Sequence, residues 1–186
     1  MARLMKTLAS SSVLATTVAA LIFAFTGSRV CFTLAITFGT ISYHFCMRLL
    51  VGLLFNQIMK NKADYTKKWF QVRCFEQKIY EKLKVKKWKD KMPVYSPETF
   101  DPAVHSWDEI AKAMCQSELV HETIIVLSFV PVIASVWVGD LPVFLITSSL
   151  SALLDFFFVV MQRYNRPRVR RLIARQKAHD NPELGQ

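Results

Sequence analysis

This sequence lacks any CxxC pair, and no cysteine and histidine spacing in it matches a zinc motif. Its four cysteines lie far apart, which argues against a structural zinc site, and we expect all four to be free thiols. They are Cys31, Cys46, Cys74 and Cys115. Acidic residues are also few, with 14 Asp and Glu against 24 Lys and Arg, so the formal net charge is +10. There is no low-complexity tract and no repeat beyond a pairing of apolar runs.

What the chain does have is apolar residues, which make up 52% of its 186 positions. The mean hydropathy is +0.24, too high for an ordinary soluble fold, so the composition indicates a single-domain integral membrane protein. On a soluble chain this charge would suggest nucleic acid. Here the basic residues follow the apolar runs, so topology and anionic lipids explain them, and we expect no nucleic-acid partner.

Four apolar runs approach the roughly 20 residues that a helix needs to cross the hydrocarbon core of a bilayer. They cover about residues 8–26, 30–58, 119–138 and 141–161. Short links, Gly27 to Arg29 and Gly139 to Asp140, separate the members of each pair. The predicted fold class is therefore all-α integral membrane, with four transmembrane helices as two hairpins and amphipathic cytoplasmic helices between them.

The N-terminal stretch MARLMKTLASSSVLATTVAALIFAF has the basic start and apolar middle of a secretory signal. It lacks a clear small-x-small cleavage site, and a second apolar run follows almost at once. We favour an uncleaved membrane helix, with a cleaved signal as the alternative.

Basic residues predict how the helices are oriented. Two precede the first run, one lies in the first link, thirteen lie between Lys60 and Lys112, none lies in the second link, and seven follow from Arg163 onward. The positive-inside rule then predicts a multi-pass protein of the cell membrane with both termini in the cytoplasm. The predicted parts are a transmembrane hairpin (1–59), a basic interfacial segment (60–117), a second transmembrane hairpin (118–162) and a basic tail (163–186).

The interfacial segment carries regularly spaced large apolar residues among its lysines. Trp69, Val72, Ile79 and Leu83 fit one stripe of an amphipathic helix lying on the membrane, and a solvated basic linker is the alternative. Further on, Ser106 resembles a helix N-cap with Glu109 at the third helical position.

Ionisable residues inside the apolar runs are costly there and are therefore candidates for function. In SELVHE, Glu118 and His121 share one helix face, and a carboxylate beside an imidazole suits proton abstraction from a hydroxyl, although these residues could also mark the headgroup boundary. At 1.5 Å per residue, His44 and Asp155 each lie roughly 21 Å below the outer ends of their helices. Arg48 lies roughly 27 Å down, where snorkelling to the inner headgroups also explains it.

The string QRYNRPR follows the last apolar run. Pro167 disfavours helix at the residue before it, so a bend is expected to present Arg163, Arg166 and Arg168 together, with Asn165 adding an amide. Guanidinium groups suit phosphate or carboxylate. The alternative is a simple stop-transfer anchor, a role that the same arginines can fill.

Three pieces of sequence carry a resemblance to a known family: QRYNRPR, the ExxH of SELVHE, and VKKWKDKMP. Over about residues 78–173 the chain resembles the glycosyl-4,4'-diaponeurosporenoate acyltransferase family of small membrane proteins. That resemblance implies transfer of a fatty acyl chain to the sugar of a carotenoid glycoside. By position it implies roles for Glu118 and His121, for Trp88, Lys89 and Lys91, and for Gln162 to Arg168.

The leading hypothesis is an acyltransferase that moves a fatty acyl group from a thioester to a hydroxyl of a membrane lipid or glycolipid. His121 would be the general base, oriented by Glu118. The predicted catalytic residues are His121, Glu118, His44 and Asp155, and the predicted substrate-binding residues are Arg48, Trp88, Lys89, Gln162, Arg163, Tyr164, Asn165, Arg166 and Arg168. We expect no metal and no cofactor; acyl-CoA or acyl-carrier protein is the donor substrate, and membrane lipids are the other partners.

The usual glycerolipid acyltransferase motif, HxxxxD, is absent, because no histidine is followed five residues later by aspartate. A different catalytic arrangement is therefore needed. The alternatives are a non-enzymatic lipid-binding or assembly protein that recognises anionic headgroups, and a small transporter in which a homo-oligomer lines a path with His44 and Asp155.

Overall fold

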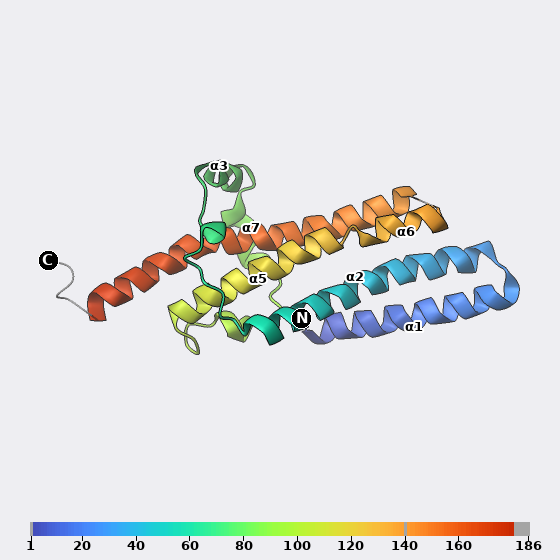
Figure 1. The fold of residues 1–186 in the computed structure, drawn as a ribbon, viewed down its shortest axis with the longest axis horizontal. Coiled ribbons are helices and arrows are strands. Elements are labelled where there is room, and N and C mark those ends of the chain that lie inside the picture. Colours follow the sequence, from blue (N-terminus) through green and yellow to red (C-terminus); the bar gives the residue numbers. More distant parts are fainter. Residues whose placement is uncertain (1, 140, 181–186) are drawn as a thin grey trace. The chain divides into compact units, whose positions relative to one another are not determined.

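The computed structural model describes residues 2–139 and 141–180, and every regular element among them is a helix (Figure 1). The elements are α1 (Ala2–Thr26), α2 (Arg29–Met59), η1 (Lys68–Phe70), α3 (Cys74–Lys82), α4 (Val85–Trp88), η2 (Lys89–Lys91), η3 (Pro97–Phe100), α5 (Trp107–Leu127), α6 (Val130–Val138) and α7 (Leu141–Asp180). Met1, Asp140 of the predicted second link, and residues 181–186 of the predicted basic tail lie outside the described residues.

Four helical stretches are long and apolar enough to cross a membrane: α1, α2, α5 together with α6, and α7. The predictions of an all-helical chain and of four such stretches are therefore confirmed, and they fit a membrane protein. Three boundaries differ from those of the apolar runs. The first stretch begins at Ala2, the third begins at Trp107 and the fourth continues to Asp180, because these helices include residues that the apolar pattern alone does not.

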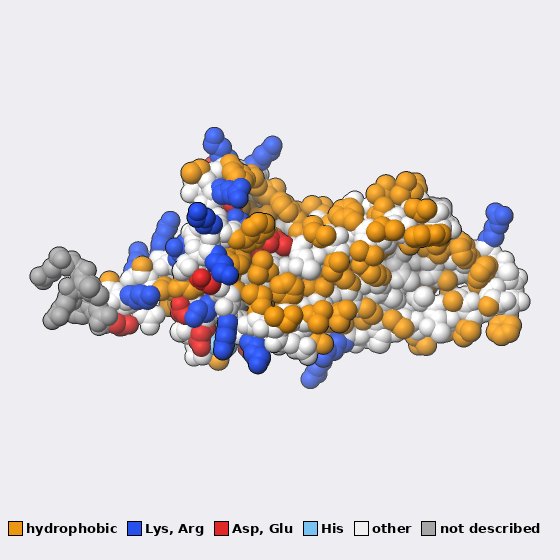
Figure 2. All heavy atoms as spheres, viewed as in Figure 1, with side chains coloured by type: hydrophobic (Ala, Val, Ile, Leu, Met, Phe, Trp, Pro, Cys, Tyr) orange, Lys and Arg blue, Asp and Glu red, His pale blue; other side chains and the backbone are white. Residues whose placement is uncertain are grey.

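The chain forms two compact units, and each is described separately. Unit 1 comprises Met1–Leu54 and Thr123–Asp155. In it α1 contacts α2 through Thr16 and Ser42, whose hydroxyl oxygens are 3.3 Å apart, and through the rings of Phe23 and Phe32, with centroids 5.0 Å apart. Many of its outward side chains are large and hydrophobic, and orange side chains are seen over much of this unit, most densely around α6 (Figure 2).

The break between α5 and α6 has a local cause. Pro131, in the first turn of α6, has no N–H and cannot bond to the carbonyl of Leu127, four residues earlier. The hydroxyl of Tyr43 donates to that carbonyl instead, at 2.8 Å. A tyrosine from α2 therefore satisfies the backbone group that the proline leaves open, which stabilises the break inside an apolar stretch.

Unit 2 comprises Phe55–Glu122 and Phe156–Gln186. One of its cores joins Ile110, Ala111 and Met114 of α5 to Val169 and Ile173 of α7. Most of the chain's Lys and Arg residues belong to this unit, and their blue side chains gather around α3 and the C-terminal part of α7 (Figure 2).

The predicted amphipathic helix through Trp69, Val72, Ile79 and Leu83 is wrong as a single element. Trp69 lies in η1, Val72 lies in an irregular link, and α3 begins only at Cys74. The link is held extended because Arg163 donates hydrogen bonds to the carbonyls of Trp69 and Gln71, so these groups do not bond within a helix. By contrast, the predicted cap is confirmed: Ser106 Oγ accepts from the Glu109 N–H (3.3 Å), and Glu109 accepts from the Ser106 N–H (2.9 Å).

The predicted bend at Pro167 is also wrong, since α7 continues through it to Asp180. A proline inside a helix costs about 3 kcal/mol or more because a backbone hydrogen bond is lost. Here the turns after the proline bury Val169 and Ile173 in the core with α5. Directly before the proline, Arg166 donates a hydrogen bond to the carbonyl of Phe70 in η1. These tertiary contacts outweigh the local preference of the proline.

Candidate functional site

The centre of unit 2 is the carboxylate of Glu118, which is fully buried on α5. It accepts a hydrogen bond from Arg163 Nη1 at 2.7 Å and a second from Arg166 Nη2. Arg166 is itself 1% exposed, donates to the carbonyl of Phe70 at 2.9 Å, and lies over the Phe70 ring, 5.0 Å from its centroid. Two guanidinium groups from α7 therefore hold one carboxylate in a water-free position.

Glu76 of α3 binds the other side of Arg163. The guanidinium donates from Nη2 to Glu76 Oε1 at 2.8 Å and from Nε to Oε2 at 3.0 Å, which is a bidentate pair. The hydroxyl of Tyr80, one turn along α3, donates to the same carboxylate. The backbone N–H of Arg73 donates to it as well, at 3.2 Å, so Glu76 also caps the start of α3.

These contacts fix the charges of the cluster. Burial alone would raise the pKa of the Glu76 carboxyl, but the hydrogen bonds from Arg163, Tyr80 and the Arg73 backbone lower it overall. Burial, and then the neighbouring Glu76 carboxylate, raise the pKa of the Tyr80 phenol. The Glu76 carboxylate is therefore stabilised in its charged form by the Arg163 guanidinium, and the Tyr80 phenol in its neutral, hydrogen-bond-donating form.

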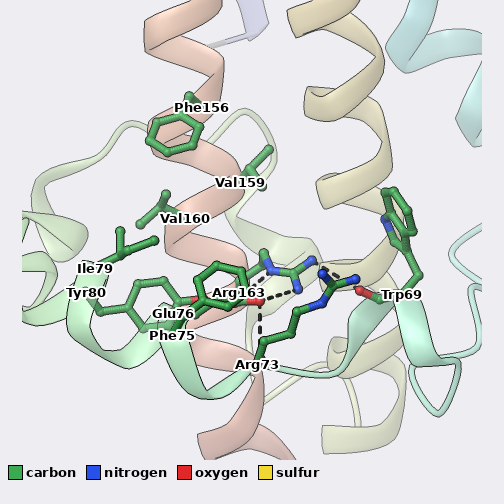
Figure 3. Close-up of a pocket in the computed structure, with 10 residues that line it drawn as sticks. All are labelled: Trp69, Arg73, Phe75, Glu76, Ile79, Tyr80, Phe156, Val159, Val160 and Arg163. Atoms are coloured by element: carbon green, nitrogen blue, oxygen red, sulfur yellow. Dashed lines mark hydrogen bonds and ion pairs between the residues drawn. The ribbon is translucent and has the colours of Figure 1, made fainter.

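A cavity with a volume of about 270 Å³ opens beside this cluster (Figure 3). Successive turns of α7 line it, first with Phe156, then Val159 and Val160, and finally Arg163. The other walls come from the segment between η1 and the end of α3, namely Trp69, Arg73, Phe75, Glu76, Ile79 and Tyr80. The cavity thus has an apolar part and a charged end, as a site for an amphiphile requires.

Arg73 differs from the other arginine at this cavity. Arg163 has two carboxylate partners, whereas the side chain of Arg73 is exposed and has no ion pair among the described residues. Figure 3 draws both guanidinium groups on the charged side of the cavity. Arg73 is therefore the cationic lining group whose hydrogen-bonding capacity remains open to an anionic ligand.

The predicted base His121 lies half-buried on α5, stacked on the ring of Phe158 with centroids 4.6 Å apart and planes 7° apart. Its neighbour Glu122 accepts a hydrogen bond from the Trp69 indole N–H at 3.0 Å. Because Trp69 also lines the cavity, this bond ties the histidine turn of α5 to one cavity wall.

The other predicted binding residues of unit 2 have contacts of their own. Gln162 donates to Ser117 at 3.1 Å. Tyr164 packs edge-on against Tyr80, and Arg168 lies over the Tyr164 ring at 4.0 Å and bonds Asn165 at 3.4 Å. Trp88 donates to the Leu83 carbonyl at 2.9 Å and packs against Phe157, while Lys89 pairs with Asp90.

Unit 1 brings together the remaining predicted residues in a second polar cluster. Arg48 Nη2 is 2.5 Å from Asp155 Oδ2 and 2.8 Å from Ser151 Oγ. Ser151 Oγ is in turn 3.1 Å from His44 Nδ1 and 3.0 Å from Ser128 Oγ. His44, Arg48 and Asp155 thus lie in one cluster of unit 1. The other two predicted catalytic residues, Glu118 and His121, belong to unit 2.

Five residues described in these clusters were missed by the sequence reasoning: Arg73, Glu76, Tyr80, Ser128 and Ser151. Two signals were available. Glu76 and Tyr80 stand four residues apart, as do Ser151 and Asp155, which is the spacing of neighbours on a helix face. Across residues 2–139 and 141–180 no group of three or more His, Cys, Asp or Glu residues is arranged to hold a metal ion, and all four cysteines are free thiols.

Comparison with known proteins gives one result. Neither the curated proteins nor the solved structures contain a match to this chain. A family model described as glycosyl-4,4'-diaponeurosporenoate acyltransferase matches residues 66–175. The matched region includes Glu118, both arginines that bind it, and every residue that lines the cavity. The chain therefore belongs to the glycosyl-4,4'-diaponeurosporenoate acyltransferase family, whose description is that of an acyltransferase acting on a glycosylated carotenoid.

Proposed function

We propose that this protein is a membrane-embedded acyltransferase that moves a fatty acyl group from a thioester donor to a hydroxyl of a glycolipid, a glycosylated carotenoid being the first candidate. The observation that carries the proposal is the position of the cavity. All ten of its lining residues lie between Trp69 and Arg163, inside the matched region 66–175. Its apolar walls and charged end suit a substrate with an acyl chain and a polar head.

In this proposal His121 is the general base. Its imidazole takes the proton from the acceptor hydroxyl as the oxygen attacks the thioester carbonyl, and the tetrahedral intermediate then collapses. The thiolate leaves and takes the proton back from the imidazolium, so that the products are an ester and a free thiol. Stacking on Phe158 fixes the plane of the ring, which reduces the freedom lost on reaching the transition state.

Arg73 is assigned to the phosphate groups of the donor, either coenzyme A or the phosphopantetheine arm of an acyl-carrier protein. Arg163 and Arg166 were the first candidates for this role, but both already bind Glu118, and Arg166 is 1% exposed. Their proposed task is to hold the segment around η1 against α5 and α7, which shapes the cavity.

The proposed topology has two transmembrane hairpins with both termini in the cytoplasm of a cell-membrane protein. The support is the distribution of Lys and Arg, most of which lie between Lys60 and Lys112 or after Arg163. Native cysteines offer a test, because Cys74 is exposed on α3. A membrane-impermeant maleimide should label Cys74 in inverted vesicles and not in intact cells; labelling in intact cells would contradict this topology.

The test of activity uses the purified full chain in lipid nanodiscs with a glucosylated carotenoid and either palmitoyl-CoA or palmitoyl-acyl-carrier protein. Mass spectrometry should detect a product heavier by one acyl chain with at least one donor. Absence of product with both donors would leave the non-enzymatic lipid-binding alternative.

Variants of two histidines then test the base. His121→Ala should lower kcat by about 100-fold or more, as expected for loss of a general base. His179→Ala is the matched control, because this histidine is exposed near the end of α7 and outside the matched region. Normal kcat in His121→Ala, with normal expression, would exclude the imidazole as the base.

A further inference from the structure

The polar cluster of unit 1 contains a histidine nitrogen with no partner. His44 is buried in α2, and its Nε2 has no hydrogen-bond partner among the described residues. Its other nitrogen, Nδ1, lies 3.1 Å from the hydroxyl oxygen of Ser151. An unpartnered polar atom in an apolar interior is unfavourable, so a partner from outside the chain would stabilise it.

The hydrogen bonds around Ser151 determine which nitrogen carries the hydrogen. The Ser128 hydroxyl donates its only hydrogen to the carbonyl of Ile124, at 2.8 Å. In the contact of 3.0 Å between Ser128 and Ser151, the donor must therefore be Ser151. Arg48 also donates to Ser151, at 2.8 Å, because a guanidinium cannot accept.

Ser151 has then used its single hydrogen and must accept from His44. The hydrogen of the neutral imidazole is consequently on Nδ1, and Nε2 presents a bare lone pair. A neutral ring is the favoured state, because Arg48 already supplies the positive charge beside the Asp155 carboxylate. His44 therefore offers an acceptor that only an incoming O–H or N–H group can satisfy.

A second buried group without a hydrogen-bond partner in the described part of the chain, the hydroxyl of Ser148, lies on the same face of α7 as Ser151. The hydroxyl of Ser148 is fully buried and has no hydrogen-bond partner among the described residues. It stands three residues before Ser151, which places the two side chains on one face of the helix. Ser148 can donate as well as accept, so the pair His44 and Ser148 complements a hydroxyl, which likewise donates once and accepts.

We propose that His44 and Ser148 mark a binding site within unit 1 for the hydroxyl group of a membrane amphiphile. The Arg48–Asp155 pair leaves the cluster without net charge, which favours a neutral ligand over an anion or a cation. Large apolar side chains are exposed on α1, on α2 and on the unit 1 part of α7, so the ligand enters from the lipid phase. A metal ion does not fit, because the described residues lack a suitable ligand set. This site is independent of the role proposed for His121.

The first test uses nuclear magnetic resonance of the full chain in nanodiscs with ¹⁵N-labelled histidine. His44→Asn assigns the signals, and it places an amide N–H near the position of Nδ1 while it removes Nε2. We expect Nδ1 of His44 to carry the hydrogen and Nε2 to lack it. A ring with the hydrogen on Nε2 would overturn the inference.

The second test titrates the wild-type chain with 1-dodecanol and, separately, with its methyl ether, which has no hydroxyl hydrogen. The ¹⁵N chemical shift of His44 Nε2 should change in a saturable way with dodecanol and should not change with the ether. Equal shifts with both ligands, or no shift because water already occupies the nitrogen, would contradict the site.

Variants give a measure of affinity that does not depend on enzymatic activity. Binding of tritiated dodecanol should weaken by about ten-fold in His44→Asn and by a smaller factor in Ser148→Ala, as expected for the loss of one hydrogen bond. Ser149→Ala is the matched control, because Ser149 is exposed on α7. Unchanged binding in folded His44→Asn would refute the proposal even if the acyltransferase activity is confirmed.

Discussion

Replacement of Glu118 by glutamine is the most direct test of the buried ion cluster in unit 2. The substitution keeps the size of the side chain and one carbonyl oxygen but removes the negative charge. Arg163 retains the bidentate contact with Glu76, whereas Arg166 loses its only carboxylate partner among the described residues. The perturbation therefore acts mainly on a guanidinium that is 1% exposed.

The expected loss of stability follows from this burial. Breaking a buried ion pair by removing one partner typically costs about 3–5 kcal/mol, because an uncompensated charge remains away from water. Solvent screening does not reduce this value much, since the Glu118 side chain is fully buried as well. For a chain of this length, such a loss corresponds to a melting temperature lower by roughly 10 °C.

The assay is thermal unfolding of the purified chain in nanodiscs, followed by size-exclusion chromatography. Glu122→Gln is the matched control, because Glu122 lies on the next turn of α5 and accepts a hydrogen bond from the neutral Trp69 indole, whereas Glu118 accepts from a buried guanidinium. A double variant, Glu118→Gln with Arg166→Met, should recover most of the lost stability by removing the unpaired charge. If Glu118→Gln unfolds at the wild-type temperature, the cluster does not contribute as described.

Three further predictions concern the cavity and α7. Arg73→Ala should raise the KM for the thioester donor by about ten-fold with little change in kcat, as measured by steady-state kinetics. Lys78→Ala is the control and should leave this KM unchanged, because Lys78 is exposed on α3 and does not line the cavity. Because partners lower the pKa of the Glu76 carboxyl, its stabilisation is complete above the ordinary carboxyl pKa of about 4.3 and disappears as the pH falls through the folded value. Thermal unfolding should thus depend on pH below about 4.3 more strongly in the wild type than in Glu76→Gln, and equal slopes would contradict this. Pro167→Ala should raise the melting temperature and leave kcat unchanged, because it restores a helical N–H; a loss of activity would show that the proline has a functional role.

Local patterns were sufficient for the elements whose cause is local. The apolar runs predicted the four long helices, and the pairing of Ser106 with Glu109 predicted the start of α5. In both cases the decisive interaction joins residues that are close in the chain. The same reasoning failed at Pro167, since the contacts that keep α7 helical involve residues of α5 and of the η1 segment.

The sites show the same division. The sequence identified His44, Arg48 and Asp155 as costly residues in apolar runs, and these do form one cluster. It also identified Arg163 and Arg166 as cations, but it assigned them to substrate phosphates. Their partners, Glu76 and Glu118, come from two other helices, and no short-range pattern indicates such a pairing.

The sequence by itself determined the all-helical fold class of this protein, the number of its long apolar helical stretches and its family. Composition, run length and short motifs are properties of neighbouring residues. Only the tertiary structure decided which charges are neutralised inside the fold and which stay open to a ligand. Arg166 is enclosed by Glu118 and the Phe70 carbonyl, while Arg73 faces a cavity without an ion-pair partner among the described residues. Each of these arginines stands two residues from an aromatic residue in the sequence, Tyr164 or Phe75. Burial separates their roles, since a charge withdrawn from water must be paired within the protein.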